Sequence, residues 1–422
     1  MLSIVIGCGN VGFETVKAIN SSGDNNSVYV LSRSYPQHLK EYILEGNKNV
    51  HFIPGDLENE KTIEEAFNLI LSEAGQADAL VVTAGVSATE SCMEKPAVFT
   101  RKLMLDSYGS FFPIEYSIRS GLLKENASIV AISSTSAHFY RPGFIAYTPA
   151  KWALESELFS FREFSTQTIN VVAPRTIRNR YSSVFTANNG VEPETVAKVV
   201  LKAIHSNNSA AFFVPPVYRV YGMIERCFPV LFDIAFRLKP RFIREASYKS
   251  YPITKAAVIG ADTELGGAMI QIIKDHFNGE VYGFPSYTEA IAGWDTGIDV
   301  VFNCIEYENG IPTDSFSAAF QSALQRYMIK YADFLSGLKK EALPKRLINL
   351  YCETNTVEKE ERCAYTAAIT ALTAFNRGAR RAVGNSIQVG EVICTLSDQK
   401  GKKKMAETIW NKTLSGKERI RC

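Results

Sequence analysis

Short runs of apolar, β-branched residues alternate with longer stretches of helical periodicity through the first half of the chain. Such alternation is typical of a parallel sheet wrapped by helices, because each strand must return through a crossover helix before the next begins. The pattern predicts a nearly complete doubly wound domain by about residue 215. The predicted strands are Ser3–Ile6, Val28–Leu31, His51–Ile53, Ala79–Val82, Ser128–Ile132, Ile169–Val172 and Ala211–Val214, and the predicted helices cover residues 12–20, 62–74, 97–119, 148–163 and 193–205.

The pattern restarts after a stretch rich in Lys, Pro, Tyr and Ser at 239–252, and the restart echoes the first half. Ile4–Gly7 corresponds to Ala257–Gly260 at an offset of 253 residues, and Ile129–Ser134 corresponds to Leu347–Cys352 at an offset of 218. This internal repeat predicts a second copy that has lost 35 residues relative to the first.

The predicted deletion falls between Tyr282 and Asp299, where a strand and its crossover helix would stand. We therefore expect an α/β protein with two tandem doubly wound parallel-sheet domains, residues 1–248 and 249–422, the second one trimmed. Within the first domain, residues 216–248 form an aromatic and basic extension.

Composition and charge are those of an ordinary globular protein. The 422 residues are 46% hydrophobic and 21% charged, which suits two or three domains with buried cores. A net charge of +2 offers no overall field for a polyanion, so we expect no nucleic-acid partner. Eight bases gather in a C-terminal tail at 400–421, which could touch anionic lipid or be simply solvated.

Cysteine usage and the N-terminus indicate the compartment. The eight cysteines show no CxxC or Cys/His spacing, so we expect no disulfide framework, no metal site and a reducing environment. The chain enters a strand at once without a secretory signal, and charged residues interrupt the apolar stretch at 222–238. We expect a cytoplasmic protein, either free or peripheral on the cytosolic face of a membrane.

The first predicted strand runs into Gly7-Cys8-Gly9-Asn10-Val11-Gly12, a GxGxxG pattern that opens a helix. Glycines permit a tight turn and let the backbone approach a pyrophosphate at the helix N-terminus. The position of the pattern favours dinucleotide binding over a plain glycine-rich turn.

Ser32 and Arg33 follow the second predicted strand, where an NAD site usually has an acid that holds the ribose hydroxyls. An arginine suits a 2′-phosphate instead. We therefore expect NADP(H) in preference to NAD(H). The alternative interpretation is that Arg33 is an ordinary surface arginine after a strand.

Ser134, Tyr147 and Lys151 form a more specific constellation. Tyr147 and Lys151 lie four residues apart on a predicted helix and share one face, and a nearby ammonium favours the phenolate of a tyrosine. Tyrosine thus becomes a usable acid or base. Ser134 ends a strand thirteen residues upstream, where its hydroxyl can hold a substrate oxygen.

With these residues, the chain from residue 1 to about 215 resembles the short-chain dehydrogenase/reductase family, whose domains have the Rossmann fold. Ser134, Tyr147 and Lys151 match the family's catalytic serine and YxxxK motif. The resemblance also implies that further segments contact the cofactor: Asp56-Leu57 near adenine, Ala84-Gly85 after the fourth strand, and Pro174 and Thr176 after the sixth.

Three positions depart from the family pattern. The glycine loop is one residue shorter than GxxxGxG, Arg175 replaces a usual glycine, and Asp106 occupies the position of the proton-relay asparagine. Asp106 is therefore a candidate catalytic residue whose relay function is open.

A closer resemblance concerns the substrate. Tyr108-Gly109-Ser110 and 143–147 are similar to segments of 3-ketodihydrosphingosine reductases, which implies a lipid ketone. Residues 216–238 of the extension would then form a lid or an interfacial helix. The alternative interpretation is an extension that packs on the core.

The second copy keeps the skeleton without the chemistry. Cys352 stands in the position of Ser134, Ile369 in that of Lys151 and Leu324 in that of Asp106, whereas Tyr365 keeps the tyrosine. We expect a pseudo-catalytic domain. Two stretches, 315–338 and 363–384, correspond to the helices through which family members commonly dimerise; docked on 97–119 and 148–163, they would form an intramolecular pseudo-dimer.

The function expected from the sequence is an NADPH-dependent carbonyl reductase that acts on an apolar ketone. Two alternatives stay open. One is an NADP(H)-binding regulatory pseudoenzyme, and the other is a saccharopine-dehydrogenase-like reductase, which leaves Ser134, Tyr147 and Lys151 unexplained.

Overall fold

The strands that the structure describes form two parallel sheets, one in each of two units of the chain. The first unit comprises Met1–Glu90 and Thr100–Phe232, and the second comprises Ser91–Phe99 and Asp233–Cys422. This computed structural model describes residues 1–85, 96–138, 144–178, 190–220, 223, 253–294, 297–305, 311–338, 343–353, 358–383, 388–395 and 406–410. The expected boundary at 248/249, most of the extension at 216–248 and nearly all of the basic tail lie outside these residues.

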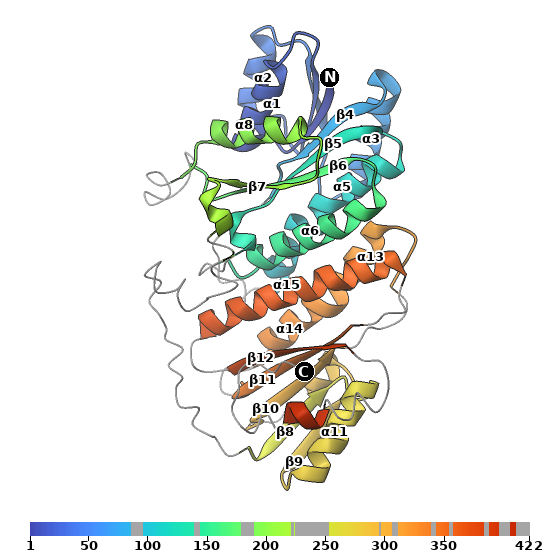
Figure 1. Ribbon diagram of the computed structural model, residues 1–422, viewed down its shortest axis with the longest axis vertical. Coiled ribbons are helices and arrows are strands. Elements are labelled where there is room, and N and C mark those ends of the chain that lie inside the picture. Colours follow the sequence, from blue (N-terminus) through green and yellow to red (C-terminus); the bar gives the residue numbers. More distant parts are fainter. Residues whose placement is uncertain are drawn as a thin grey trace. The chain divides into compact units, whose positions relative to one another are not determined.

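Seven strands build the sheet of the first unit (Figure 1). They are β1 (Leu2–Ile6), β2 (Ser27–Ser32), β3 (Val50–Pro54), β4 (Ala77–Val82), β5 (Leu123–Ile132), β6 (Thr168–Pro174) and β7 (Ala211–Val214). Their order is β3-β2-β1-β4-β5-β6-β7, with every neighbouring pair parallel. All seven predicted strands lie within observed ones.

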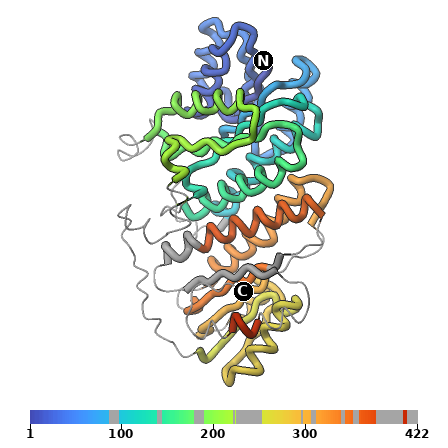
Figure 2. Tube along the Cα trace, in the orientation of Figure 1, coloured from blue at the N-terminus to red at the C-terminus, as the bar shows by residue number. Residues whose placement is uncertain are grey.

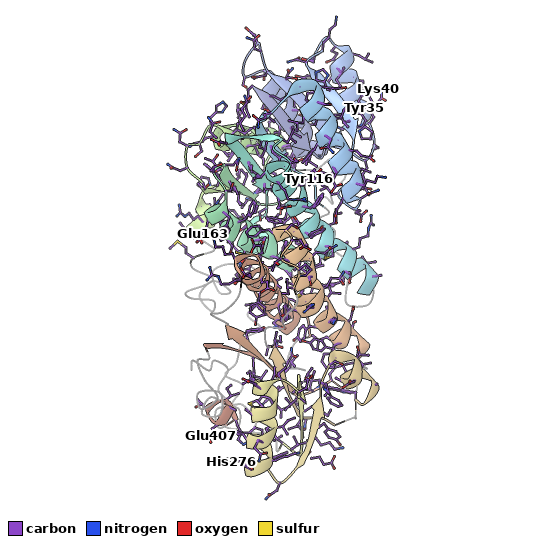
Figure 3. The ribbon with its side chains drawn as sticks, turned by 90° about the vertical axis from the view of Figure 1, so that its right-hand side faces the viewer. Tyr35, Lys40, Tyr116, Glu163, His276 and Glu407 are labelled. Atoms are coloured by element: carbon purple, nitrogen blue, oxygen red, sulfur yellow. The ribbon has the colours of Figure 1, made fainter. Side chains whose placement is uncertain are left out.

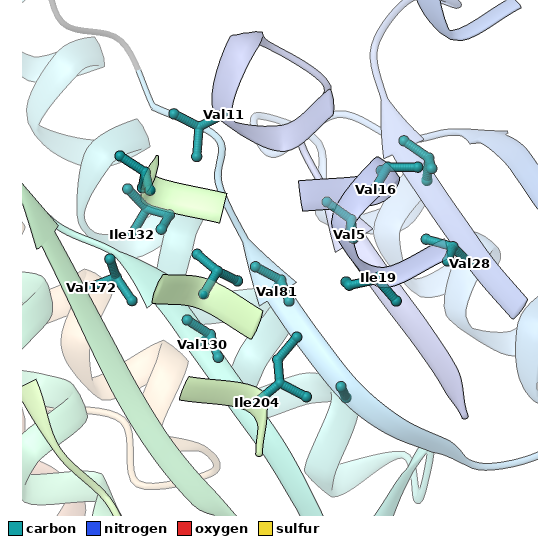
Figure 4. Packing of buried hydrophobic residues seen from close by; sticks show 14 of the residues in the cluster. Val5, Val11, Val16, Ile19, Val28, Val81, Val130, Ile132, Val172 and Ile204 are labelled. Atoms are coloured by element: carbon teal, nitrogen blue, oxygen red, sulfur yellow. The ribbon is translucent and has the colours of Figure 1, made fainter. Parts of the chain in front are cut away.

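Helices cover both faces of this sheet (Figure 1). The first face carries α1 (Asn10–Asn20), α2 (Gln37–Leu44) and α8 (Pro193–Ile204), and the second carries α3 (Glu60–Ala74), α5 (Tyr108–Arg119) and α6 (Tyr147–Phe161). A buried cluster joins the first face to the sheet (Figure 4), and burying each aliphatic side chain contributes about 1.5–3 kcal/mol. The cluster includes Val5, Val28, Val81, Val130 and Val172 from strands and Val16, Ile19 and Ile204 from helices.

Two helix predictions were wrong in detail. The single helix predicted at 97–119 is two helices, α4 (Pro96–Asp106) and α5, because Ser107 leaves helical geometry with a φ of −110° and a ψ of −82°. The second correction is α2, which was not predicted. Among its side chains only Leu39 is fully buried, so the helix leaves little apolar periodicity in the sequence.

The second unit has a smaller parallel sheet, and Figure 2 colours this part of the chain from yellow, near residue 253, to red at 406–410. Its strands are β8 (Lys255–Ile259), β9 (Glu280–Phe284), β10 (Val300–Ile305), β11 (Arg346–Glu353) and β12 (Gln388–Thr395), and its helices are α11 (Glu264–His276), α12 (Tyr287–Ala292), α13 (Phe316–Ala323), a π-helical turn Leu324–Ile329, α14 (Lys330–Gly337) and α15 (Lys359–Val383). The predicted fold class, with a smaller second sheet, is confirmed.

Strand order relates the two sheets. The order β9-β8-β10-β11-β12 follows that of β2-β1-β4-β5-β6, and the described residues contain no counterpart of β3 or β7. Between β9 and β10 the described chain has only the short helix α12. Within these described residues, no helix is long and apolar enough to cross a membrane.

One aspartate in each unit ties the beginnings of three central strands together. Asp78 of β4 accepts hydrogen bonds from the backbone N–H of Leu2 in β1 (2.7 Å) and from Lys124 Nζ in β5 (2.6 Å). Asp299, just before β10, accepts bonds from the backbone N–H of Thr254 (2.7 Å) and from Lys345 Nζ (2.6 Å). The aspartate and the lysine are 46 residues apart in both units.

We predict that Asp299→Asn destabilises the second unit in a pH-dependent way. Burial raises the pKa of Asp299, but hydrogen bonds from Lys345, Thr254 and Lys255 outweigh it and lower this pKa from 3.8 to about 2. A depressed carboxyl pKa stabilises the fold above the unfolded-state pKa, and this stabilisation is lost as the pH falls towards 2. With allowance for solvent screening, the substitution should lower the free energy of unfolding by about 1 kcal/mol at pH 7.

Urea unfolding at pH 7 and near pH 2.5 measures the effect. In a Trp152→Phe background, the remaining tryptophans, Trp294 and Trp410, both lie in the second unit and report on it. Asp275→Asn, on the exposed surface of α11, is the matched control and should change stability little. A stability difference that is the same at both pH values would contradict the prediction.

Candidate functional site

Loops at the carboxyl ends of four adjacent strands surround a cavity of about 190 Å³. Carboxyl ends of parallel strands meet at one edge of the sheet, and ligands of doubly wound folds bind there. The cavity brings together eight predicted cofactor residues: Gly7 and Gly9 after β1, Ser32 and Arg33 at the end of β2, Asp56 and Leu57 after β3, and Ala84 and Gly85 after β4.

The glycine loop has the close approaches that its sequence implies. Gly7 has a φ of +91°, and a Cβ there would lie 2.7 Å from the backbone N of Ala84. At Gly12, a Cβ would lie 2.0 Å from the carbonyl oxygen of Gly7. Only glycine therefore fits at either position.

The entrance of α1 is open beside the cavity. Gly9 is the N-cap, no side chain caps the helix, and a Cβ at Gly9 would meet no atom within 4 Å. Backbone N–H groups at an uncapped helix start suit a phosphate, so the loop fits the pyrophosphate of a dinucleotide. Asn10, Val11 and Gly12 form the first turn of α1 and are not among the described residues that line the cavity.

Arg33 lies at the cavity with its side chain largely exposed. Its NH1 is 3.6 Å from Oε2 of Glu58. The two carboxylate oxygens of Glu58 each accept a hydrogen bond from Arg101. Arg33, the residue predicted to bind a 2′-phosphate, thus belongs to a cluster of two arginines and one glutamate. Sequence analysis missed Glu58 and Arg101, because nothing in the chain pattern joins residues 43 positions apart.

Ser134, Tyr147 and Lys151 lie where the sequence predicts them, after β5 and in the first turns of α6. Ser134 Oγ accepts a hydrogen bond from the backbone N–H of Ser136 (3.1 Å) at the start of a 3-10 turn. Tyr147 is the first residue of α6, and Lys151 Nζ lies 5.9 Å from the centroid of its ring. The one-turn spacing therefore places the ammonium beside the phenol ring, as expected.

Lys151 is buried and held from two sides. Its Nζ donates to the carbonyl oxygen of Ile132 (3.2 Å) and lies 3.8 Å from Oδ1 of Asp106, which is fully buried at the end of α4. Burial lowers the pKa of Lys151, whereas the carboxylates of Asp106 and Glu155 raise it. The ammonium beside Tyr147 is thus partly compensated by a buried negative charge.

Gly85 connects the cavity to this charged pair. A Cβ at Gly85 would lie 2.8 Å from Asp106 Oδ1 and 3.3 Å from Lys151 Nζ. Because Gly85 lines the cavity and packs on both charged groups, the cavity is continuous with the Asp106–Lys151 pair in the first unit.

Sequence analysis missed a buried His–Glu pair near Ser134 and Lys151 in the chain. His138 Nε2 is 3.0 Å from Oε2 of Glu155, and both side chains are largely buried. Glu155 lies one helical turn after Lys151, and His138 lies four residues after Ser134. Because His138 and Glu155 lie on separate elements, no periodic pattern in the sequence marked their pairing.

The predicted residues after β6 take a different place. Pro174 ends β6, and neither it nor Thr176 is among the described residues that line the cavity. Arg175 donates its backbone N–H to Val214 (2.9 Å), and its guanidinium lies 5.8 Å from the centroid of the Tyr218 ring. The loop is therefore attached to the end of β7 and the residues after it.

In the second unit, a threonine side chain of the corresponding loop caps the following helix. Thr263 is the N-cap of α11: its Oγ1 accepts the N–H of Gly266 (3.0 Å) and donates to the carbonyl oxygen of Gly260 (2.8 Å). One backbone donor at the start of α11 is thus occupied, and Asp262 and Glu264 stand on either side of Thr263. Tyr365 donates to the carbonyl oxygen of Ile305 (3.4 Å), and the side chain of Cys352 lies outside the described residues.

Comparisons with known proteins relate part of the chain to dehydrogenases and reductases. A family model described as enoyl-(acyl carrier protein) reductase matches residues 8–214. L-rhamnose-1-dehydrogenase of Scheffersomyces stipitis is 30% identical over 117 residues, which cover 27% of this chain and 45% of that protein. This chain therefore spans less than half the length of that relative. Short-chain dehydrogenase reductase 3a of Arabidopsis thaliana is 26% identical over 232 residues, covering 49% of this chain and 84% of the relative.

Solved structures give similar partial matches. A short-chain dehydrogenase family protein of Francisella tularensis covers 52% of this chain and 98% of its own, with a TM-score of 0.43 and 18% identity. A short-chain dehydrogenase/reductase of Serratia marcescens covers 50% and 95%, with a TM-score of 0.45 and 19% identity. The family model and the curated relatives thus show that the chain is similar to short-chain dehydrogenases/reductases.

Proposed function

We propose that the first unit is an NADPH-dependent carbonyl reductase that converts a ketone to an alcohol. The observation that supports the proposal is the continuity, through Gly85, between the cavity at the glycine loop and Lys151, whose ammonium lies beside the Tyr147 ring. Bound NADPH supplies a hydride to the carbonyl carbon. The protein's own residues then have to orient the carbonyl and deliver one proton to its oxygen.

Each catalytic side chain has a defined part in this proposal. The Ser134 hydroxyl orients the carbonyl oxygen, and the Tyr147 phenol donates the proton that the developing alkoxide takes up. The Lys151 ammonium stabilises the phenolate that remains and holds the cofactor ribose. NADP(H) is preferred because Arg33 borders the cavity where a 2′-phosphate would lie.

The proposed substrate is an apolar ketone, with lipid ketones the first class to test. Support comes from the beginning of the extension, where Val217, Val220 and Met223 expose 43%, 52% and 60% of their surfaces at a helical spacing of three. Such a surface suits an apolar chain or contact with the cytosolic face of a membrane. Turnover of short-chain but not long-chain ketones would argue against a lipid substrate.

A second candidate function is an NADP(H)-binding regulatory pseudoenzyme. The Asp106–Lys151 pair favours it, because a carboxylate 3.8 Å from the ammonium weakens the field that acts on Tyr147. NADPH oxidation with a panel of ketones distinguishes the candidates, since a pseudoenzyme binds the nucleotide without turnover.

We further propose that the second unit is a pseudo-catalytic copy that replaces a partner subunit. This proposal rests on the common strand order, the matching Asp–Lys pairs and the retention of the helical stretches 315–338 and 363–384. Sedimentation as a 46.8 kDa monomer is the expected result, and a stable dimer would count against this proposal.

Tyr147→Phe should abolish reduction while leaving cofactor binding intact. Loss of the proton donor should lower kcat by at least about 100-fold, the usual contribution of general acid catalysis. Ketone-dependent NADPH oxidation and NADPH fluorescence titration measure the two effects. Tyr116→Phe on α5 (Figure 3) removes a phenolic hydroxyl from a side chain that does not line the cavity, and it should retain activity. An active Tyr147→Phe enzyme would refute the mechanism.

Asp106→Asn should shift the pH dependence of the reaction. Removing the buried carboxylate leaves the Lys151 ammonium less compensated, so the phenolate of Tyr147 is favoured at lower pH. The midpoint of the kcat/KM profile should fall by about one pH unit. A rise of the midpoint would mean that Lys151 had lost its proton, contrary to the prediction.

NADPH should bind with a stoichiometry of one per chain. The open entrance of α1 offers N–H donors to a phosphate, whereas Thr263 occupies the equivalent donor in α11. Isothermal titration calorimetry measures the stoichiometry, and Gly12→Val should abolish the single site because a Cβ there meets the Gly7 carbonyl. Two equivalents of NADPH per wild-type chain would contradict the assignment of the second unit.

A further inference from the structure

A cluster of three charged side chains borders the cavity of the first unit where a 2′-phosphate would lie. Arg33 lines the cavity after β2, Glu58 follows the cavity-lining residues Asp56 and Leu57 after β3, and Arg101 belongs to α4. The catalytic proposal gives no part to Glu58 or Arg101. A carboxylate at this place needs an explanation, because it repels the phosphate that Arg33 would bind.

Arg101 engages both carboxylate oxygens of Glu58. Its Nε lies 2.5 Å from Oε1, and its NH2 lies 2.8 Å from Oε2. Such a two-bond fork fixes the plane of the carboxylate as well as its position. Arg33 approaches the same Oε2 but stays at 3.6 Å, beyond hydrogen-bond distance. The glutamate is therefore committed to Arg101, and Arg33 has only a loose electrostatic contact with it.

The loop that carries Glu58 is fixed as well. The backbone N–H of Glu58 donates to Oδ1 of Asp56 (3.0 Å), and the N–H of Asp56 donates to Thr62 Oγ1 (2.9 Å). Hydrogen bonding to Arg101 lowers the pKa of the Glu58 carboxyl, with smaller contributions from the charges of Arg101 and Arg33. The carboxylate thus stays ionised beside the cavity, and its charge must be balanced there.

We propose that Arg101 is a positioning residue for cofactor preference, which holds and neutralises Glu58 so that Arg33 can bind a 2′-phosphate. This inference rests on the proposed use of NADP(H). When the phosphate arrives, Arg33 exchanges its loose contact with Glu58 for the phosphate, while the fork keeps the carboxylate on Arg101. Without Arg101, Glu58 would pair with Arg33 and repel the phosphate.

Arg101→Gln tests the inference through the ratio of two affinities. The Kd for NADPH should rise about five-fold, in the range of partly exposed charge interactions, while the Kd for NADH stays the same. NADH lacks the 2′-phosphate and so does not sense the released carboxylate. Glu58→Gln in the Arg101→Gln background should restore NADPH affinity, because the repelling charge is then absent.

Two further variants exclude simpler explanations. Lys61→Gln removes a positive charge three residues from Glu58, from a side chain that pairs with Glu65 (3.8 Å), and it should leave the NADPH/NADH ratio unchanged. Arg101→Lys keeps the charge but loses the fork, so it should recover only part of the preference. Thermal unfolding of each variant shows whether the fold is retained, and the double variant separates charge from a folding defect.

The outcomes separate failure of this inference from failure of the proposed function. If the wild-type protein binds NADH as well as NADPH, the proposed NADP(H) preference falls, and the inference falls with it. If the wild type prefers NADPH and Arg33→Gln removes the preference, but Arg101→Gln leaves it intact, only the inference is overturned. A loss of NADPH affinity in Arg101→Gln that Glu58→Gln fails to restore overturns it as well.

Discussion

In the first unit, the carboxylate of Asp78 holds the beginnings of β1 and β5 against β4 through hydrogen bonds of 2.6–2.7 Å. Parallel strands that start in a fixed register also end in a fixed register, because each residue adds a constant rise. The loops that carry Gly7, Gly85 and Ser134 therefore emerge together at the opposite edge of the sheet. Asp299 makes the matching contacts in the second unit, so both units share this constraint.

The two units differ in the loops built on that common frame. In the first, Gly9 leaves the start of α1 uncapped and open, whereas in the second the Thr263 hydroxyl already occupies a backbone donor of α11. A side-chain cap stabilises a helix by about 1 kcal/mol but removes an anion site. The frame thus supports both proposed roles, one catalytic and one structural, and the loop residues decide between them.

Charge compensation recurs around the proposed active site. Asp106 partly balances the buried Lys151 ammonium, and Arg101 balances Glu58 beside Arg33. A buried or crowded charge is costly unless a partner lies close, so each functional cation brings an acid with it. In the proposed mechanism these acids tune the cations: Asp106 weakens the field at Tyr147, and Glu58 affects the anion that Arg33 can bind.

The sequence by itself determined the elements that depend on local order along the chain: the seven strands of the first unit, the glycine loop, and the one-turn spacing of Tyr147 and Lys151. These follow from periodicity, backbone freedom and helix geometry, which act over a few residues. Sequence analysis missed α2 because few of its residues are buried. It missed the helix break at Ser107 because the backbone conformation of a single residue causes that break. Only the tertiary structure decided which polar and charged side chains meet, such as Glu58 with Arg101 and His138 with Glu155. Such pairs join separate elements through the fold, and solvent-facing or isolated polar residues leave no periodic signal in a sequence.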